Sequence, residues 1–279
     1  SALGRQRRLN SVGESVLQIA PNAAAAYSLR SLTGGDPKVV RVRRDTDGGA
    51  GDNDEQDFTA SEVSSGALAA FVGSGNDGFV ETWYDQSGNS KDATQATANL
   101  QPKIVNAGSL LTDGIDFDGT SQAGLITGSF SLTQAFTTFS VSHTDDASSF
   151  QGIWSTAANT VTNINSTSFF GNNDGFAVTA GNILTTAGTI DYVADRTYLR
   201  TNVVNGGSSS IFVDGATGAT GNAGSTNPSG ILILGYFRST SYFNLDGAIK
   251  ELIIYDSDQT SNRAALETNI AAANGVTLS

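Results

Sequence analysis

The chain has 279 residues, 32 of them Gly and only 4 Pro, and a formal net charge of −12. It contains no Cys and a single His, which excludes disulfides, thiolate metal sites, Cys nucleophiles and metal sites built from several His. No apolar run reaches the length of a membrane span, and no P-loop is present for nucleotide phosphates. We therefore expect short strands joined by many turns, with a core that needs no disulfide or metal.

Charge is distributed unevenly along the chain. Residues 1–44 carry 8 Lys or Arg and 2 acids, whereas residues 45–279 carry 7 Lys or Arg and 25 acids. A basic front on an acidic body suggests an anchoring arm at residues 1–22, followed by one domain at residues 23–279. Solubility through net charge is the alternative explanation. The acidic body argues against nucleic acid as a partner, because phosphate binding needs clustered Lys and Arg.

The arm combines basic residues with a short apolar patch. Its candidate partner contacts are Arg5, Arg7, Arg8, Leu17 and Ile19. It docks on a partner or on the domain, and a disordered terminus is the alternative. Because no long apolar segment follows the Arg residues, we expect no standard secretion signal.

Two short helices with a strand between them are expected next. Asn22 stands before Ala23–Ala26 as a helix N-cap signal, which predicts a helix over residues 23–32. Alternating Val and Arg at residues 39–43 predict a strand with one solvent-facing side. A second helix is expected at residues 62–72, with Ser61 as its N-cap.

The segment from residue 45 to residue 57 is the most acidic part of the chain. Crowded carboxylates on a Gly-rich loop can bind Ca²⁺, and the candidate ligands are Asp45, Asp47, Asp52 and Asp54. The spacing departs from the EF-hand pattern, because Gly49 stands where a further ligand should follow. A solvated loop without metal is the alternative, and no other cofactor is expected.

Residues 79–106 are expected to form a strand, a turn, a polar excursion and a second strand. Aromatic and β-branched residues up to Tyr84 suit a half-buried strand, and residues 85–89 suit a turn. Pro102 leads into the second strand at residues 103–105. The aromatic pair Trp83 and Tyr84 beside a carboxylate could form a sugar-binding edge, or it could fill the core.

After residue 106 the chain is expected to be all-β, as a sandwich or barrel. Strands are predicted at residues 115–117, 136–142, 153–154, 169–170, 176–179, 190–193, 198–204, 210–213, 231–237 and 248–255. Residues 231–234 and 252–254 are continuously apolar and should be covered on both faces. Residues 217–229 are interpreted as a mobile loop, and Ser261 as the cap of a last helix over residues 262–273.

The candidate chemistry of the chain rests mainly on carboxylates, amides and aromatic rings. His143 ends a predicted strand, and no G-x-S-x-G motif accompanies it. Glycoside hydrolysis needs only two carboxyl groups, and the candidates are Asp85, Asp116, Asp118, Asp174, Asp246 and Glu251. Sugar binding without catalysis would draw on Trp83, Tyr84, Asp85, Asn89, Trp154, Tyr236 and Tyr242. A purely architectural domain that binds no soluble ligand is the third hypothesis.

One stretch of the chain resembles known modules. Residues 83–89 read WYDQSGN and are followed by DATQAT, QP and IVN. This series is similar to a module of bacteriophage virion and tail proteins, and YDQSGN also resembles a block in the catalytic domain of family-54 arabinofuranosidases. Both belong to the concanavalin-A-like (LamG-type) jelly-roll class. Further matching segments occur in order, so the resemblance covers about residues 23 to 278.

The resemblance implies an all-β jelly-roll β-sandwich with a few short helices. It also implies a non-catalytic virion structural protein, in the tail or on the capsid, that is made in the host cytoplasm and displayed on the particle. The arm would bind other virion proteins, the domain would contact host surface glycan or a neighbouring subunit, and the protein would form a homo-oligomer. The alternative is an arabinofuranosidase-like glycoside hydrolase, although the Cys-rich segment that carries the nucleophilic Glu in those enzymes has no match here.

Overall fold

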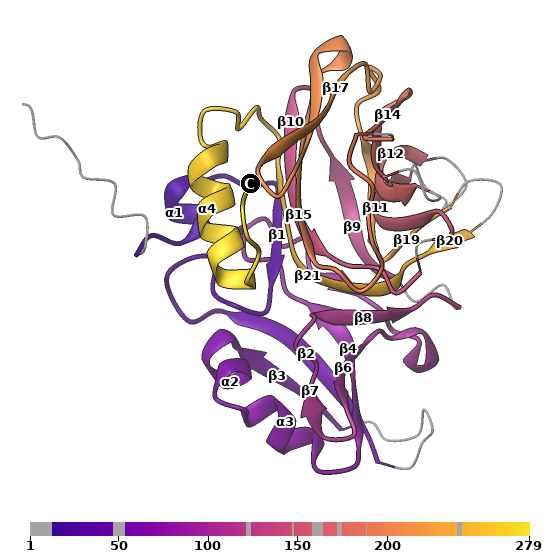
Figure 1. Cartoon of the computed structure of the whole chain (residues 1–279). Coiled ribbons are helices and arrows are strands. Elements are labelled where there is room, and N and C mark those ends of the chain that lie inside the picture. The colour runs from indigo at the N-terminus through magenta and orange to yellow at the C-terminus, as the bar shows by residue number, and fades with distance from the viewer. Residues whose placement is uncertain are drawn as a thin grey trace, which may run out of the picture.

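The computed structural model describes residues 13–46, 54–120, 124–146, 148–157, 164–171, 175–187, 189–238 and 242–279. These residues form two facing antiparallel sheets with a smaller lobe attached at one end (Figure 1). The all-β sandwich with a few short helices that the sequence predicts is therefore confirmed. None of the helices in this part of the chain is long and apolar enough to cross a membrane.

The first sheet is centred on β21 (Asp246–Tyr255), which has partners along both edges. One edge pairs with β1 (Ala25–Ser28) and β8 (Ile115–Asp118), and the other with β10 (Phe136–Ser142). Beyond β10 lie β15 (Tyr198–Val204), β16 (Ser209–Val213) and β17 (Ala216–Gly221). Leu252 and Ile254 face the sandwich core, whereas Ile253 and Tyr255 face the helices outside, so this apolar strand is covered on both faces as predicted.

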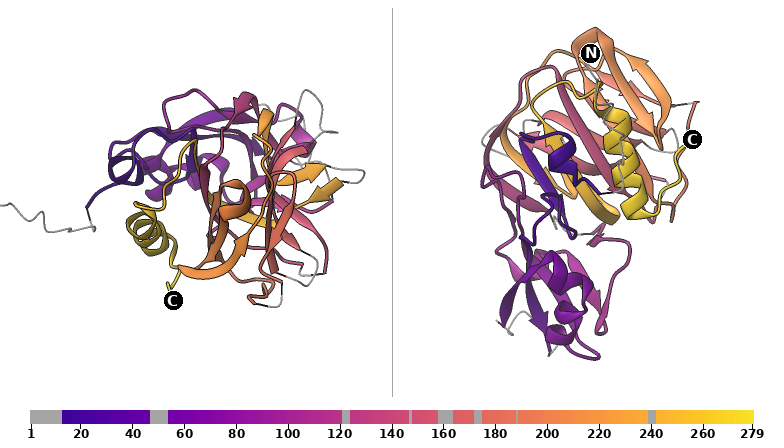
Figure 2. Two further views of the ribbon diagram at one scale, coloured as in Figure 1. Left: turned by 90° about the horizontal axis from the view of Figure 1, so that it is seen from above. Right: turned by 90° about the vertical axis from the view of Figure 1, so that its left-hand side faces the viewer.

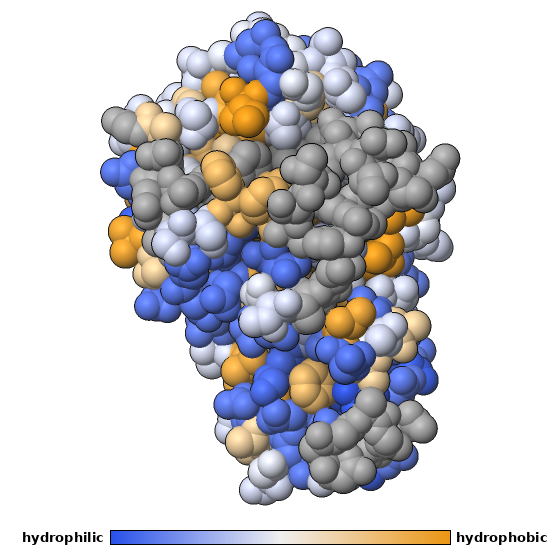
Figure 3. All heavy atoms as spheres, turned by 90° about the vertical axis from the view of Figure 1, so that its right-hand side faces the viewer, coloured by the Kyte–Doolittle hydropathy of each residue, from blue (hydrophilic) through white to orange (hydrophobic). Residues whose placement is uncertain are grey.

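The second sheet is built around β11 and β18. Its strands, in order of pairing, are β5 (Ala93–Thr94), β9 (Leu125–Ser131), β18 (Ser229–Leu234), β11 (Gln151–Ala157), β12 (Ile164–Gly171), β13 (Gly175–Thr179) and β14 (Ile183–Thr185). A separate hairpin of β19 (Tyr236–Arg238) and β20 (Tyr242–Asn244) follows β18. On the face in Figure 3, apolar residues among the coloured atoms are scattered and form no continuous patch.

The smaller lobe contains β2 (Lys38–Asp45), β3 (Glu55–Thr59), β4 (Asp77–Trp83), β6 (Lys103–Asn106) and β7 (Ser109–Leu110). Two short helices, α2 (Ala60–Ser64) and α3 (Ala67–Val72), pack on it. Single 3₁₀ turns lie at Ala98–Leu100 and Gly206–Ser208. Strand β8 joins the lobe to the sandwich, because it pairs with β6 and with β21.

Helices α1 (Val16–Ile19) and α4 (Arg263–Asn274) cover the outer face of the first sheet (Figure 2). Val16 is fully buried, and Leu17 and Ile19 pack against the same apolar cluster. Residues 13–22 are thus docked on this domain, which is one of the two placements expected for the arm. Arg5, Arg7 and Arg8 lie outside the described residues.

Several local predictions were wrong, and tertiary packing explains them. Residues 25–28 are strand β1 rather than helix, because Ala25 and Ala26 are fully buried on opposite faces of a strand paired with β21. The helix expected at residues 62–72 is two helices, separated by Gly66 at φ +85°, and Thr59 rather than Ser61 is the first N-cap. Residues 190–193 are not a strand, and residues 217–221 form part of β17.

Candidate functional site

Most of the predicted aromatic ligand residues are placed in the interior. Trp83 and Trp154 are 0% exposed and Tyr236 is 3% exposed, so packing accounts for these three side chains. Tyr84 is half-buried, and its hydroxyl donates to Asp57 Oδ1 at 2.8 Å. Burial, together with the Asp57 carboxylate, raises the pKa of Tyr84 to about 12. The Tyr242 side chain lies outside the described part of the structure.

The turn after Trp83 is held by its own polar side chains. Asp85 accepts hydrogen bonds from the backbone N–H groups of Ala26, Ser87 and Lys91. Asn89 Nδ2 donates to the carbonyl of Ala23 at 2.8 Å. Both predicted ligand residues therefore tie the turn to neighbouring segments in this structure.

The predicted carboxylates fall into two groups. Glu251 is 1% exposed and accepts two hydrogen bonds from Arg30, at 2.9 and 2.8 Å, so it is committed to an ion pair. Asp118 accepts the N–H of Thr120 at 3.0 Å, and Asp174 lies outside the described residues. Asp116, in contrast, lines a polar hollow, and Asp246 lies on the paired strand β21 but is not part of the lining.

The hollow is built on a row of paired residues across adjacent strands. Lys103 on β6 pairs with Asp116 on β8, and Asp116 pairs with Ala248 on β21. Ala248 exchanges two backbone hydrogen bonds with His143, which follows β10, at 3.0 and 3.2 Å. Directly paired residues present their side chains on the same face of a sheet. The row therefore carries an ammonium, a carboxyl and an imidazole on one face, and the small Ala248 lies between the last two.

The space above Ala248 is a hollow of about 390 Å³. Its walls come from the row itself, from Asn106 at the end of β6 and from neighbouring loops: Leu111, Asp113, Gly114, Asp145, Asp195 and Thr197. Because neighbouring strands are about 4.8 Å apart, the backbones of Asp116 and His143 are separated by roughly 10 Å. That is enough width for a small polar ligand to rest over Ala248.

The polar groups around the hollow differ in how strongly they are held. His143 Nε2 lies 3.1 Å from Asp145 Oδ1, and Lys103 Nζ donates to Asp77 Oδ2 at 2.7 Å. The carboxyl group of Asp116 has no hydrogen bond to any residue in the described ranges. Burial raises the pKa of Asp116, and the nearby Asp145 carboxylate raises it further. Burial and the same Asp145 also raise the pKa of Asp246.

Sequence reasoning found only part of this site. Asp116 and Asp246 were named as carboxylate candidates, but Asp145 was missed and His143 was interpreted as a polar strand-end residue. The residues around the hollow are brought together by the pairing of β8, β21 and the end of β10, and these segments are distant in sequence. The predicted Ca²⁺ loop remains a prediction, because Asp47 and Asp52 lie outside the described residues. In the described ranges, no cluster of three or more acidic, His or Cys side chains is arranged to hold a metal ion.

Comparisons with known proteins identify relatives of the fold. No protein-family model and no curated protein sequence matches the chain. An arabinofuranosidase solved with arabinofuranosyl-α-1,2-xylobiose superimposes with a TM-score of 0.64 at 16% identity, over 90% of this chain and 63% of that one. A GH54 α-L-arabinofuranosidase variant soaked with 4-nitrophenyl α-L-arabinofuranoside gives 0.66 at 16% identity, with the same coverage. The sialidase of Trypanosoma rangeli gives 0.50 at 11% identity, over 71% of this chain and 32% of that one.

These likenesses define a class of fold. The chain is a β-sandwich of the kind found in arabinofuranosidases, as its sequence resemblance to that family implied. It spans less than two thirds of the length of those enzymes. At such low identity the likeness establishes the fold alone, and the activity has to be argued from the residues of this chain.

Proposed function

We propose that this domain binds carbohydrate in the hollow over Ala248. The observation that carries this proposal is the arrangement of Asp116, His143 and Lys103 on one sheet face around a small residue. A sugar has several hydroxyl groups, and each of them both donates and accepts, so different hydroxyls can bond to the carboxyl, the imidazole and the ammonium group. A volume of about 390 Å³ lies in the range of small-ligand sites.

The fold relatives support the same class of ligand. The arabinofuranosidases were solved with arabinofuranosyl-α-1,2-xylobiose and 4-nitrophenyl α-L-arabinofuranoside, and the sialidase was solved in complex with 2,3-difluorosialic acid. The hollow is lined by more acidic than basic side chains, with Asp113, Asp116, Asp145 and Asp195 beside Lys103 and His143. Because like charges repel, neutral sugars suit it better than sugars that carry a carboxylate.

Titration of the purified protein with arabinose-containing oligosaccharides, after a glycan array, tests the proposal. Asp116→Asn removes the charge with little change of shape, and Ala248→Leu fills the space above the strand. We expect both changes to weaken sugar binding at least tenfold. The matched control is Asp258→Asn, because Asp258 is exposed, lies outside the hollow and accepts only a local backbone N–H of Thr260 at 2.8 Å. Unchanged binding in both hollow variants would refute this location.

Glycoside hydrolysis is the second candidate function, and the raised pKa of Asp116 is the observation that favours it. A glycosidase needs one protonated carboxyl to donate to the leaving oxygen and a second, ionised carboxyl nearby. Here Asp116 would be the acid, and Asp145, held by His143, would be the second carboxylate. Release of 4-nitrophenol from 4-nitrophenyl α-L-arabinofuranoside is the assay, and Asp116→Asn should abolish it. Sugar binding without any release would leave the domain as a binding module.

We also propose, from the sequence resemblance, that the domain is displayed on a bacteriophage particle as a homo-oligomer. In this proposal the basic residues Arg5, Arg7 and Arg8 contact other virion proteins, and the sandwich faces outward toward host glycan. A cryo-EM map of the native particle is the test. The proposal requires the chain to be present with its hollow exposed, and its absence from the particle would contradict it.

A further inference from the structure

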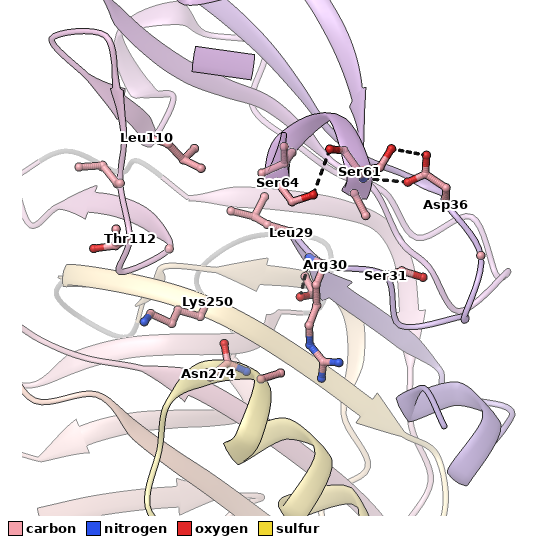
Figure 4. A pocket seen from close by; sticks show the side chains of 17 residues that line it. Leu29, Arg30, Ser31, Asp36, Ser61, Ser64, Leu110, Thr112, Lys250 and Asn274 are labelled. Atoms are coloured by element: carbon pink, nitrogen blue, oxygen red, sulfur yellow. Dashed lines mark hydrogen bonds between the residues drawn. The ribbon is translucent and has the colours of Figure 1, made fainter. Parts of the chain in front are cut away.

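A second and larger hollow lies where the smaller lobe meets the sandwich. Its volume is about 680 Å³, and its walls come from the segment after β1, from α2, from the β7–β8 connection, from β21 and from the end of α4 (Figure 4). Leu29, Val63 and Leu110 give it an apolar wall, and Arg30, Lys250 and Asn274 are among its polar groups. These polar groups come from other residues than the polar groups of the first hollow.

Arg30 and Asn274 each have an atom with no hydrogen-bond partner in the described part of the chain, and Lys250 is held only by a long ion pair. Arg30 uses Nε and Nη2 on Glu251 and Asn269, which leaves Nη1 unused. Lys250 has a side chain only 18% exposed, and its Nζ forms an ion pair with Asp113 Oδ1 at 3.7 Å, which is too long for a hydrogen bond. Asn274 donates through Nδ2 to Glu251 and Ile270, which leaves its Oδ1 as a free acceptor.

This combination of donors and an acceptor selects the chemistry of the occupant. A carboxylate or phosphate would accept from Arg30 and Lys250 but could give nothing to the Asn274 Oδ1. A sugar hydroxyl can accept from the first two and donate to the third. The C–H faces of a sugar ring can also rest against the apolar wall formed by Leu29, Val63 and Leu110.

The two hollows are neighbours that share part of their lining. Leu111 and Gly114 line both of them, and Ala248 and Lys250 lie two residues apart on β21. Gly114 has φ +110°, and a Cβ added there would lie 2.5 Å from the carbonyl oxygen of Ile249. The Leu111–Gly114 turn is therefore packed closely on β21, and it lies at the boundary that the two hollows share.

We propose that the hollow beside Arg30 and Lys250 is an extension site for the same glycan that enters the hollow over Ala248. The ligand is then a neutral oligosaccharide, with one end over Ala248 and the chain continuing past Leu111 to Lys250 and Asn274. This inference rests on the proposed carbohydrate binding and adds the requirement for an extended chain.

Calorimetric titration with neutral oligosaccharides of increasing length tests the inference. The probes are α-1,5-linked arabino-oligosaccharides and β-1,4-linked xylo-oligosaccharides of two to six residues. Ala273→Trp places a large ring in the extension site, since Ala273 lines it and is exposed on the last turn of α4. Ala272→Trp is the matched control, because Ala272 is also exposed on that turn but does not line the hollow.

For one of the two series, we expect affinity to rise at least tenfold from the disaccharide to the pentasaccharide. Ala273→Trp should remove this gain and leave disaccharide binding unchanged, whereas Ala272→Trp should keep both. Disaccharide binding with no gain from length, or a gain that survives Ala273→Trp, would overturn the extension site and leave the proposed function standing. If neither series binds at any length, the proposed function fails and the extension site fails with it.

Discussion

Asp116 is a carboxyl group whose ionised form the fold disfavours. Burial and the Asp145 carboxylate raise its pKa above the value of about 3.9 in an unfolded chain. The folded protein therefore holds this proton more tightly than the unfolded chain, so the contribution of Asp116 to stability is full below about pH 4. That contribution is lost as the pH rises through the raised pKa. Ionisation of Asp116 therefore lowers stability at neutral pH, and its carboxyl has no hydrogen bond in the described residues that would offset this loss. Such an arrangement is typical of a functional carboxyl.

Asp116→Asn is expected to stabilise the protein at neutral pH while it weakens sugar binding. The amide cannot ionise, so it escapes the penalty that wild type acquires as the pH rises above about 4. Urea unfolding at pH 3.5 and pH 7 should show a larger gain in the free energy of unfolding at pH 7. An Asn variant that is less stable than wild type at pH 7 would mean that Asp116 has a structural role.

Asp57 has the opposite behaviour. Burial alone would raise its pKa, but hydrogen bonds from Lys38, Tyr84 and Arg41 outweigh burial and lower the pKa to about 2. The stabilisation is therefore present above about pH 4 and is lost as the pH falls toward 2. Because Lys38 and Arg41 are partly solvated, we expect Asp57→Asn to cost only about 1 kcal/mol at pH 7. Denaturant unfolding at pH 7 and pH 2 checks this, and an equal cost at both pH values would contradict it.

At the scale of elements, apolar patterns predicted a strand correctly where the local sequence and the pairing with neighbouring strands favour the same structure. Phe136–Ser142 and Tyr198–Val204 have the predicted bounds, because β-branched and aromatic residues alternate or run through buried strands. The Ala-rich segment that became β1 could not be predicted locally. Alanine favours a helix, but here its small size allows close packing between two apolar layers. Pairing with β21, more than 200 residues away, therefore outweighs the helix propensity of these alanines.

The YDQSGN block is a structural clamp between elements, and Gln86 is its centre. Its Oε1 accepts from Leu32 N at 2.7 Å, and its Nε2 donates to the carbonyls of Ser28 and Arg30 at 3.0 and 2.9 Å. Gln86 is 7% exposed, so water cannot replace these bonds freely. The block therefore holds the connection between β1 and β2, which also forms one wall of the larger hollow.

Gln86→Ala is expected to lower the free energy of unfolding by about 3 kcal/mol or more, because buried backbone groups lose their partners. Thermal or urea denaturation measures this loss. Asn89→Ala in the same turn serves as the comparison, and it should cost less than about 1 kcal/mol because Asn89 is exposed and water can satisfy the freed groups. Equal effects of the two substitutions would show that the clamp does not depend on Gln86.

At the scale of the whole molecule, the site could be predicted only in its parts. The sequence named Asp116 and Glu251 as equal candidates, but the fold pairs Glu251 with Arg30 and leaves Asp116 beside an open hollow. Trp83 and Trp154 were candidates for sugar binding, with core packing as the alternative, and both are fully buried. Which polar residue faces solvent depends on strand pairing across the chain, and no local pattern contains that information.

The smaller lobe and the sandwich share one apolar core, and this has a consequence for unfolding. Phe58 and Val80 of the lobe belong to the same buried cluster as Leu232 and Ile254 of the sandwich. A continuous core favours one cooperative transition for both parts. We therefore expect the lobe and the sandwich to unfold together.

The two Trp residues of the chain offer one reporter for each part. Trp83 lies on β4 of the lobe, with its ring 5.6 Å from that of Tyr27, and Trp154 lies on β11 of the sandwich. Trp154→Phe leaves Trp83 as the fluorescent probe, and Trp83→Phe leaves Trp154. In each variant, the urea midpoint from fluorescence should coincide with the midpoint from far-UV circular dichroism. If Trp83 fluorescence changes at lower urea than the dichroism of the same variant, the lobe unfolds first, and the larger hollow is then bounded by a part that can open independently.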